Sequence, residues 1–298
     1  MPSNEHEKAS GKKYVLVTAA YNEEAFIERL IKSVVSQTIQ PQKWIIVSDA
    51  STDRTDEIVS KYSRSNPFIT LLRMTNGHQR NFTAQYHAIN AGFSELQPLK
   101  YDYIGNLDAD VSFDAEYFSR LITLLEGDSN LGLAGGSIYE QHRGKEFRFR
   151  PTNRSHSVPL AVQLFRRDCL ESIGGAYLPL PYGGPDWHAE VTARMRGWRV
   201  QSFPDLKVFH HRPTGSADGV LRYCFQAGLM DFSVGAHPLF QIIKLLTRTG
   251  SRPFILGSLY RLVGFIWAYC RREKRAVSPE FAAYLRREQM ERLQAIFR

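Results

Sequence analysis

Short apolar segments alternate with amphipathic segments over about the first two thirds of the chain. Four segments rich in β-branched and aromatic residues predict buried strands: 14–19, 44–48, 69–73 and 103–107. Apolar residues at helical spacing predict helices at about 26–37, 54–62, 80–93 and 115–125. This alternation predicts an α/β fold with a mostly parallel sheet and helices on both faces.

Polar side chains follow several of the predicted strands. Right-handed crossovers put these strand-to-helix loops at one edge of the sheet, so we expect their side chains to converge there. They are Asn22, Glu23, Asp49, Asp53, Asp108 and Asp110. The Asp108-Ala109-Asp110 pair is suited to hold a divalent metal that also binds phosphate oxygens. The alternative is a solvated turn after a strand, where Asp is common.

Glycine-rich phosphate-binding motifs are missing from this chain. No Gly-x-Gly-x-x-Gly follows the first predicted strand, and no glycine-rich lysine loop occurs elsewhere in the sequence. If the site binds phosphates, they must be held in another way. This again favours a metal held by carboxylates.

Four motifs, in this order and spacing, resemble the nucleotide-sugar half of glycosyltransferase family 2. They are Ala20-Tyr21-Asn22-Glu23, Ser48 to Asp53, Leu107-Asp108-Ala109-Asp110, and Gly183-Gly184-Pro185-Asp186-Trp187, with Pro185 where the family has Glu. The similarity covers about residues 14–212. It implies the GT-A fold, a Rossmann-like mixed sheet flanked by helices, here followed by a C-terminal helical extension.

The resemblance implies an inverting glycosyltransferase. Such an enzyme moves a sugar from a UDP-, GDP- or dTDP-sugar to the hydroxyl of a saccharide or lipid-linked saccharide, in polysaccharide or glycolipid assembly. The Gln-x-x-Arg-Trp motif of the related processive synthases is absent, which favours transfer of a single sugar. Two alternatives are a nucleotidyltransferase of the same fold, which would need a basic glycine-rich first loop, and a non-catalytic membrane-associated scaffold, which would need neither Asp110 nor Asp186.

The resemblance also implies which residues bind the nucleotide sugar. By the resemblance, Asp49 is expected at the base and Asp108 near the ribose or the metal. From the residues themselves, Trp187 offers a stacking face for the sugar, and Arg80, at the start of a predicted helix, would lie near the diphosphate. The full set is Thr18, Ala20, Tyr21, Asn22, Glu23, Asp49, Arg80, Asp108, Ala109 and Trp187. Capping of a helix is the alternative role for Asp49, a helix-dipole interaction for Glu23, and a solvated helical turn for Arg80.

The family's direct metal ligand corresponds to Asp110, which would hold Mg²⁺ or Mn²⁺. A histidine beyond the last strands often completes the metal site, and His210 or His211 fits that place. Side chains alternate along a strand, so only one of the two can face the site. We favour His211.

Asp186 is the candidate general base for inversion. It precedes a predicted helix at 187–196, whose N-terminus would help to hold an anion. The alternative is that Asp186 caps this helix, and one residue can do both. Between these motifs, the basic segment 143–150 lacks periodicity and predicts a loop near the site.

The composition of the chain leads to an expectation about its cellular compartment. The 298 residues are 43% hydrophobic and 23% charged, which is ordinary for a globular protein. Three widely spaced cysteines form neither a metal-ligand motif nor a disulfide framework, and the polar segment 1–13 has no secretory signal. We therefore expect a disordered tail at 1–13 and a cytoplasmic location.

Positive charge concentrates in the C-terminal third. The net charge is +8, and twelve Arg and Lys residues lie from Lys244 onward. Apolar helices are predicted at 237–246 and 253–270, the second with Arg261 near its middle. We expect a catalytic domain at 14–212 and a helical extension at 213–298 on the cytoplasmic face of a membrane, with no nucleic-acid partner. The alternative is a helical hairpin packed on the catalytic domain.

Overall fold

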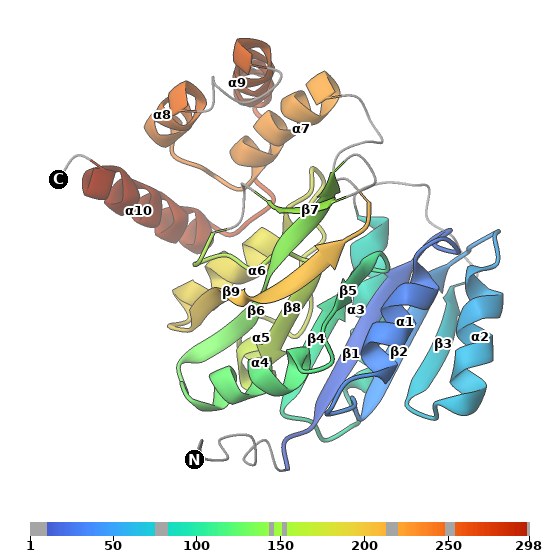
Figure 1. Cartoon of the computed structure of the whole chain (residues 1–298). Coiled ribbons are helices and arrows are strands. Elements are labelled where there is room, and N and C mark those ends of the chain that lie inside the picture. The colour runs from blue at the N-terminus through green and yellow to red at the C-terminus, as the bar shows by residue number, and fades with distance from the viewer. Residues whose placement is uncertain are drawn as a thin grey trace. The chain divides into compact units, whose positions relative to one another are not determined.

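The computed structural model describes residues 11–74, 83–142, 146–150, 154–212, 220–247 and 254–296. They form two compact units (Figure 1). The N-terminal unit contains the described residues up to Leu178 and those from Asp186 to Arg212. The C-terminal unit contains Pro179–Pro185 and the described residues from 220 onward. Residue 80, which we expected near the diphosphate, lies outside the described residues.

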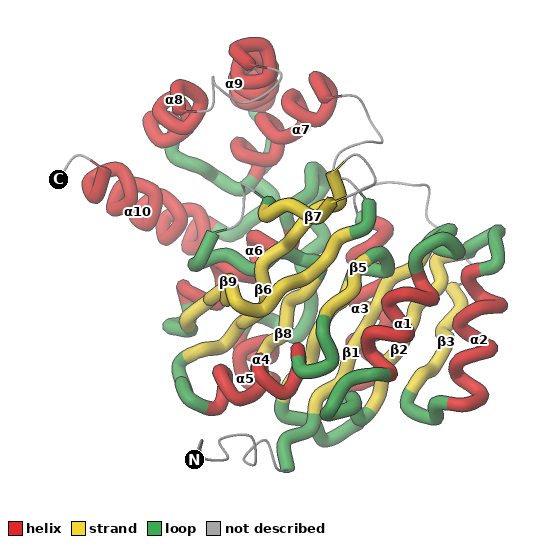
Figure 2. Tube along the Cα trace, viewed as in Figure 1, coloured by secondary structure: helices red, strands yellow, loops and turns green. Residues whose placement is uncertain are grey.

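The N-terminal unit is built on one mixed β-sheet (Figure 2). Its strands are β1 (Tyr14–Ala20), β2 (Lys43–Asp49), β3 (Ile69–Met74), β4 (Tyr103–Leu107), β5 (Val111–Phe113), β6 (Leu131–His142), β7 (Glu146–Phe149), β8 (Val162–Arg166) and β9 (Arg199–His210). Its helices are α1 (Ile27–Val35), α2 (Thr55–Ser65), α3 (Ala84–Leu96), α4 (Tyr117–Glu126), α5 (Arg167–Ser172) and α6 (Pro185–Met195). The predicted α/β class is confirmed.

The strand order is β3-β2-β1-β4-β8-β6-β9-β5, with β7 paired to β6. Strands β3, β2, β1 and β4 run parallel, and β8 joins β4 in antiparallel orientation. From β1 the chain proceeds outward to β2 and β3, and then returns to place β4 on the other side of β1. The carboxyl ends of β1 and β4 therefore flank the point where the direction of winding reverses, which is where open α/β sheets bind ligands.

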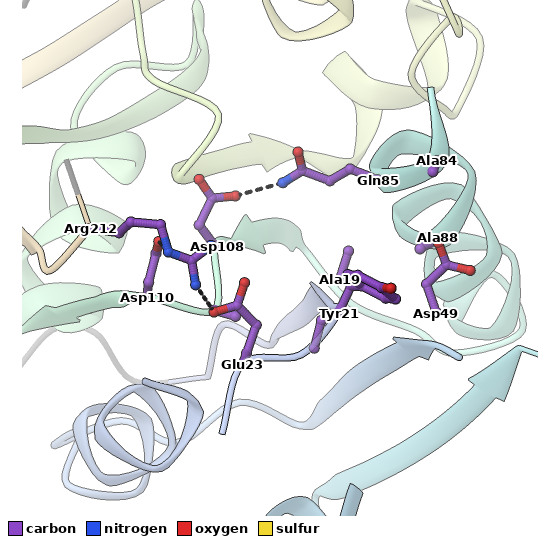
Figure 3. Close-up of a pocket in the computed structure, with 12 residues that line it drawn as sticks. Ala19, Tyr21, Glu23, Asp49, Ala84, Gln85, Ala88, Asp108, Asp110 and Arg212 are labelled. Carbon is purple, nitrogen blue, oxygen red and sulfur yellow. Dashed lines mark hydrogen bonds and ion pairs between the residues drawn. The ribbon is translucent and has the colours of Figure 1, made fainter. Parts of the chain in front are cut away.

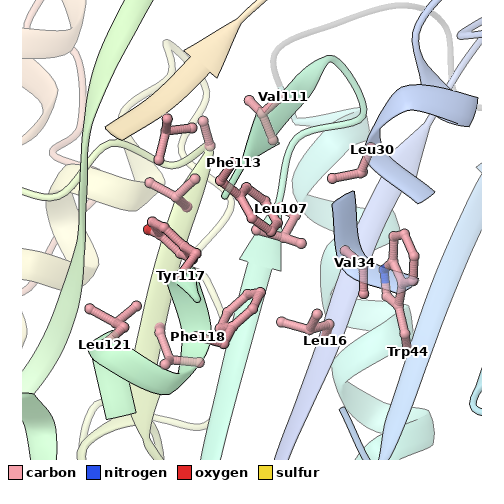
Figure 4. Packing of buried hydrophobic residues seen from close by; sticks show 14 of the residues in the cluster. Leu16, Leu30, Val34, Trp44, Leu107, Val111, Phe113, Tyr117, Phe118 and Leu121 are labelled. Carbon is pink, nitrogen blue, oxygen red and sulfur yellow. The ribbon is translucent and has the colours of Figure 1, made fainter. Parts of the chain in front are cut away.

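Helices cover both faces of the sheet with separate hydrophobic cores. Along β1, Leu16 joins the core beneath α1, α2 and α4, whereas Val15 and Val17 join the core beneath α3, α5 and α6. This alternation is the period of two expected for a strand that is buried on both faces. Figure 4 shows the first core, where Phe118 of α4 and Val34 of α1 lie on either side of Leu16.

A glycine lets α3 approach the sheet closely. A Cβ atom on Gly92 would lie 2.6 Å from Val17 Cγ1, inside normal contact distance. Because α3 rests on the sheet at this short distance, its N-terminal residues lie beside the carboxyl end of β4, as the contact between Gln85 and Asp108 demonstrates.

The predicted loop at 143–150 is wrong for its described part. Residues 146–149 form β7, which pairs with β6 in antiparallel register from His142↔Glu146 to Tyr139↔Phe149. Aromatic contacts account for the difference: Phe149 packs against Tyr139 with ring centroids 5.6 Å apart, and Phe147 packs against Phe209 at 5.0 Å. Cross-strand aromatic pairs of this kind stabilise a strand that lacks a strong local pattern.

The C-terminal unit consists of helices α7 (Val220–Ser233), α8 (Pro238–Thr247), α9 (Phe254–Cys270) and α10 (Pro279–Ile296). Helices α7 and α9 pack against each other at two glycines, since a Cβ on Gly264 would lie 2.2 Å from the carbonyl oxygen of Phe225, and one on Gly228 would lie 2.0 Å from that of Arg261. None of the described helices combines the length and the apolar character needed to cross a bilayer.

Candidate functional site

A pocket of about 340 Å³ opens at the carboxyl ends of β1, β2 and β4 (Figure 3). Its volume lies in the range of small-molecule sites, and its position is the reversal point of the sheet. It is lined by Ala19, Ala20, Tyr21, Glu23, Asp49, Ala84, Gln85, Ala88, Asp108, Ala109, Asp110 and Arg212. Residues from three strand ends, α3 and the segment after β9 therefore share one cavity.

The loops after β1 and β2 are tied to each other. Asn22 has a φ of 53°, and its side-chain oxygen accepts a hydrogen bond from the backbone N–H of Thr52 at 2.8 Å. The backbone N–H of Glu23 donates to Thr55 Oγ1 at 2.8 Å. Asp53 accepts hydrogen bonds from the backbone N–H and the hydroxyl of Thr55, the first residue of α2, and is not among the residues that line the pocket. These bonds fix the loop that presents Tyr21 and Glu23.

Three side chains form a cluster that fits a divalent cation. A carboxylate oxygen of Asp108, one of Asp110 and a ring nitrogen of His210 all lie within 4.8 Å of one another. Nε2 of His210 is 3.0 Å from Oδ1 of Asp110, while Nδ1 of His210 is buried without a hydrogen-bond partner among the described residues. Two hard carboxylates and one imidazole form a donor set suited to Mn²⁺ or Mg²⁺.

The structure brings His210 rather than His211 beside the aspartates, in contrast to our preference from the sequence. The reason is strand register, because β5 pairs with β9 at Val111↔His210, directly after Asp110. The ring of His211 instead bonds to Ser112 Oγ at 2.8 Å and packs edge-on against Phe147. Burial, aided by Arg29, lowers the pKa of His211 to about 4, so its ring is neutral at pH 7.

Like charges dominate the electrostatics of the cluster. Burial and the neighbouring Asp110 carboxylate raise the pKa of Asp108 to about 7. Burial alone would favour a neutral imidazole at His210, but the hydrogen bond to Asp110 and the charges of Asp110, Asp108 and Glu140 together outweigh it and raise the pKa of His210. A cation bound here would relieve this repulsion.

Arg212 supplies a second positive charge to the pocket. Its guanidinium forms an ion pair with Glu23, and its Nε lies 3.6 Å from Oδ2 of Asp110 (Figure 3). Burial raises the pKa of Glu23, although Arg212 opposes this effect. The last residue of β9, His210, and Arg212 in the segment after β9 thus both contact one carboxylate, Asp110.

Asp186 lies in the first turn of α6, and its carboxylate contacts α3. The hydroxyl of Tyr86 is 3.3 Å from Oδ1 of Asp186. Burial raises the pKa of Asp186, and the charge of Asp186 in turn contributes to the raised pKa of Asp108. Trp187 follows and is partly buried.

The residues expected to bind the nucleotide sugar fall into two groups. Most of them line the pocket: Ala20, Tyr21, Glu23, Asp49, Asp108 and Ala109. Thr18, Asn22 and Trp187 are not among the described lining residues. Thr18 is buried within β1, where its hydroxyl accepts a hydrogen bond from Trp44 Nε1 at 3.1 Å, and Asn22 serves the loop described above.

Sequence reasoning missed three residues of this site. Gln85 and Tyr86, adjacent on α3, contact Asp108 and Asp186 respectively, so one helix end contacts both aspartates. Arg212 is the third. Its place in the His-His-Arg segment after a predicted strand was the available signal, while no local pattern marked Gln85 or Tyr86.

Comparison with known proteins decides the family. The sequence profile of glycosyl transferase family 2 matches residues 15–175, which is more than half of the chain. The chain belongs to glycosyl transferase family 2. As a family 2 glycosyltransferase, it shares 32% identity over 119 residues with the poly-β-1,6-N-acetyl-D-glucosamine synthase of Staphylococcus aureus, a match covering 40% of the chain and 27% of that enzyme.

Solved structures with the same fold include two sugar-nucleotide complexes. The mannosyltransferase PcManGT from Pyrobaculum calidifontis, bound to GDP-Man and Mn²⁺, gives a TM-score of 0.57 at 17% identity, covering 96% of this chain and 81% of that one. Staphylococcus aureus TarS 1-349, bound to UDP-GlcNAc, gives 0.56 at 16% identity, covering 92% and 79%. These similarities confirm the GT-A fold. The matched stretch spans about a third or less of the curated relatives' length.

A second buried carboxylate, Glu190, lies one turn after Asp186 on α6. Its Oε1 accepts hydrogen bonds from the backbone N–H of Val158 at 2.7 Å and from Ser157 Oγ at 3.1 Å. Burial and the charge of Asp186 raise the pKa of Glu190 to about 8. Glu190 therefore anchors the segment before β8 to the helix that carries Asp186.

We expect the free energy of unfolding of the glycosyltransferase to fall as the pH rises, because Glu190 ionises. The pKa of Glu190 is higher in the folded than in the unfolded chain. Glu190 therefore contributes fully to the free energy of unfolding below the unfolded pKa near 4.5, and this contribution is lost as the pH approaches about 8. Glu190→Gln keeps the accepting oxygen and cannot ionise. Urea unfolding across this range should show a smaller pH-dependent loss of unfolding free energy in the variant, and parallel curves for both proteins would contradict this.

Proposed function

We propose that this family 2 enzyme transfers one sugar from a nucleoside-diphosphate sugar to an acceptor hydroxyl with inversion at the anomeric carbon. The observation that carries the proposal is the Asp108-Asp110-His210 cluster, whose two aspartates line a pocket of about 340 Å³. In this interpretation residues 14–212 form the catalytic domain, and residues 213–298 form an extension. The three free cysteines fit a cytoplasmic enzyme.

The pocket has features that suit a nucleoside diphosphate. Asp49 lines it and is only 9% exposed, and its Oδ1 has no hydrogen-bond partner among the described residues. Such an acceptor matches an N–H donor on a nucleobase, because a buried carboxylate oxygen without a partner is costly. Tyr21, 45% exposed at the same pocket, offers a ring for stacking. Relatives of this fold bind GDP-Man and UDP-GlcNAc, which supports the donor class.

Asp108, Asp110 and His210 would hold Mg²⁺ or Mn²⁺. When bound, the metal neutralises the diphosphate and acts as a Lewis acid for the leaving group. Gln85 orients Asp108 through a 3.0 Å hydrogen bond. Arg212 places a guanidinium beside the same pocket, where it adds positive charge for phosphate oxygens.

Asp186 would act as the general base. Inversion requires the proton of the acceptor hydroxyl to move to a carboxylate while the diphosphate leaves on the opposite face of the sugar. Burial raises the pKa of Asp186, which strengthens it as a base, and Tyr86 fixes the orientation of its carboxylate. Trp187 would provide an apolar surface for the sugar.

The name of one relative supports a proposal for the acceptor class. The Staphylococcus aureus relative is named as a synthase of an N-acetylglucosamine polymer, which supports a saccharide or lipid-linked saccharide as acceptor. The missing Gln-x-x-Arg-Trp segment favours transfer of a single sugar over processive synthesis. This enzyme would therefore act in polysaccharide or glycolipid assembly.

The two histidines give a matched test of the metal site. His210→Ala removes a ligand and should weaken Mn²⁺ binding by about tenfold or more, whereas His211→Ala, one residue away on the opposite side, should leave binding nearly unchanged. Mn²⁺ binding by each variant, with UDP or GDP present, is measured as the loss of the free Mn²⁺ signal in electron paramagnetic resonance. A larger effect of His211→Ala would reverse the assignment.

Asp186→Asn separates chemistry from binding. Release of nucleoside diphosphate from a panel of nucleotide sugars, with mixed oligosaccharide acceptors, should fall by about 10²- to 10⁴-fold, while donor affinity stays the same. The wild-type rate should rise with pH through the raised pKa of Asp186 and then level off, because only the carboxylate accepts a proton. The exposed Asp205→Asn is the control. Wild-type turnover in Asp186→Asn would exclude this base.

A further inference from the structure

Helix α9 has an exposed face made entirely of apolar residues. Going along the helix, these residues recur every three or four positions, so they form one stripe. They are Leu256, Leu259, Tyr260, Val263, Ile266, Trp267 and Cys270, here called the α9 stripe. Leu259, Ile266 and Trp267 are about half exposed. An unbroken apolar strip of this length on a described surface is characteristic of an interaction site.

The single charged residue of α9 points away from this stripe. Arg261 binds Asp231 of α7 through two hydrogen bonds, at 2.6 and 3.0 Å, and Lys244 of α8 lies 3.1 Å from the same carboxylate. The side chain of Arg261 is only 14% exposed. This buried ion cluster therefore fixes the rotation of α9, since turning the helix would remove Arg261 from the buried carboxylate of Asp231.

Close glycine packing fixes the same rotation independently. Gly228 of α7 and Gly264 of α9 meet where neither has room for a Cβ. One side of α9 is thus packed on α7, and the exposed stripe is available to a partner. On α8, which also packs against α9, Leu239 and Ile242 are about half exposed and add apolar surface to this unit.

Positive charge lies directly after the stripe. Arg271, Arg272, Lys274 and Arg275 are all exposed, and the guanidinium of Arg271 lies 4.9 Å from the ring centroid of Trp267. Residues 214–298 carry thirteen Arg and Lys against six Asp and Glu, which accounts for +7 of the net +8. An apolar stripe with Trp and Tyr, next to a basic cluster, matches the chemistry of an anionic bilayer surface.

We propose that the α9 stripe and its basic cluster dock the C-terminal unit on an anionic phospholipid bilayer, with α9 parallel to the surface. Because one side of α9 packs on α7, lipid can reach only the stripe, to a depth of about 5–10 Å. The 17-residue helix would extend along the interface for about 26 Å. A second copy of the chain fits less well, since it would bring a unit of the same +7 charge to the stripe.

The test is co-sedimentation of the full chain with vesicles. We expect binding to vesicles of phosphatidylcholine with phosphatidylglycerol, weaker binding to phosphatidylcholine alone, and loss of binding in high salt.

The double variant Val263→Asp with Ile266→Asp should bind at least about tenfold more weakly. Arg271→Ala and Lys274→Ala should each weaken binding about fivefold. Leu124→Glu, at a similarly exposed leucine of α4, should bind like the wild type.

Two outcomes would overturn the proposal. One is absence of wild-type binding to anionic vesicles, or equal binding by the double aspartate variant. The other is a dimer in sedimentation equilibrium that the same variant dissolves, which would assign the stripe to a second copy. Nucleotide binding measured on the same samples reports on the N-terminal unit separately, so failure of the membrane proposal leaves the proposed transferase function to its own tests.

Discussion

Mutual repulsion among the carboxylates of one pocket is the constraint on which the site depends. Glu23, Asp108 and Asp110 all line it, and burial deprives them of the water that would screen their charges. The described residues offset this with two positive groups, His210 and Arg212, both bound to Asp110. The fold keeps these carboxylates close together despite their repulsion. Asp108 and Asp110 lie between β4 and β5, and Glu23 lies in the loop after β1.

The strand ends come together through topology and register. The reversal of winding between β1 and β4 sets the Glu23 loop beside Asp108, and the β5–β9 pairing places His210 against Asp110. Helix α3, which lies close to the sheet at Gly92, supplies Gln85 to Asp108 and Tyr86 to Asp186, the two aspartates with roles in the proposed reaction. A site that depends on this many long-range contacts is positioned before any ligand arrives, which is what charge stabilisation in a transition state requires.

Local patterns were enough to predict the strands and helices around the pocket, because apolar periodicity survives in each segment alone. The Asp-x-Asp pair and its place after a strand could also be read directly. Which side chains of β9 face the site could not be predicted. Alternation requires that one of His210 and His211 faces inward but does not determine which one. Likewise β7 packs through Phe147 on Phe209 of β9, which is far away in sequence, and Gln85, Tyr86 and Arg212 gain their roles only from tertiary contacts.

The central claim is that a divalent metal on Asp108, Asp110 and His210 recruits the donor nucleotide. Calorimetric titration with UDP, GDP, dTDP and CDP, each with and without Mn²⁺, tests it most directly in the wild type and in Asp110→Ala. We expect that one nucleotide binds only with metal present and that Asp110→Ala abolishes this binding. Equal nucleotide affinity without metal, or unchanged metal-dependent binding in Asp110→Ala, would contradict it.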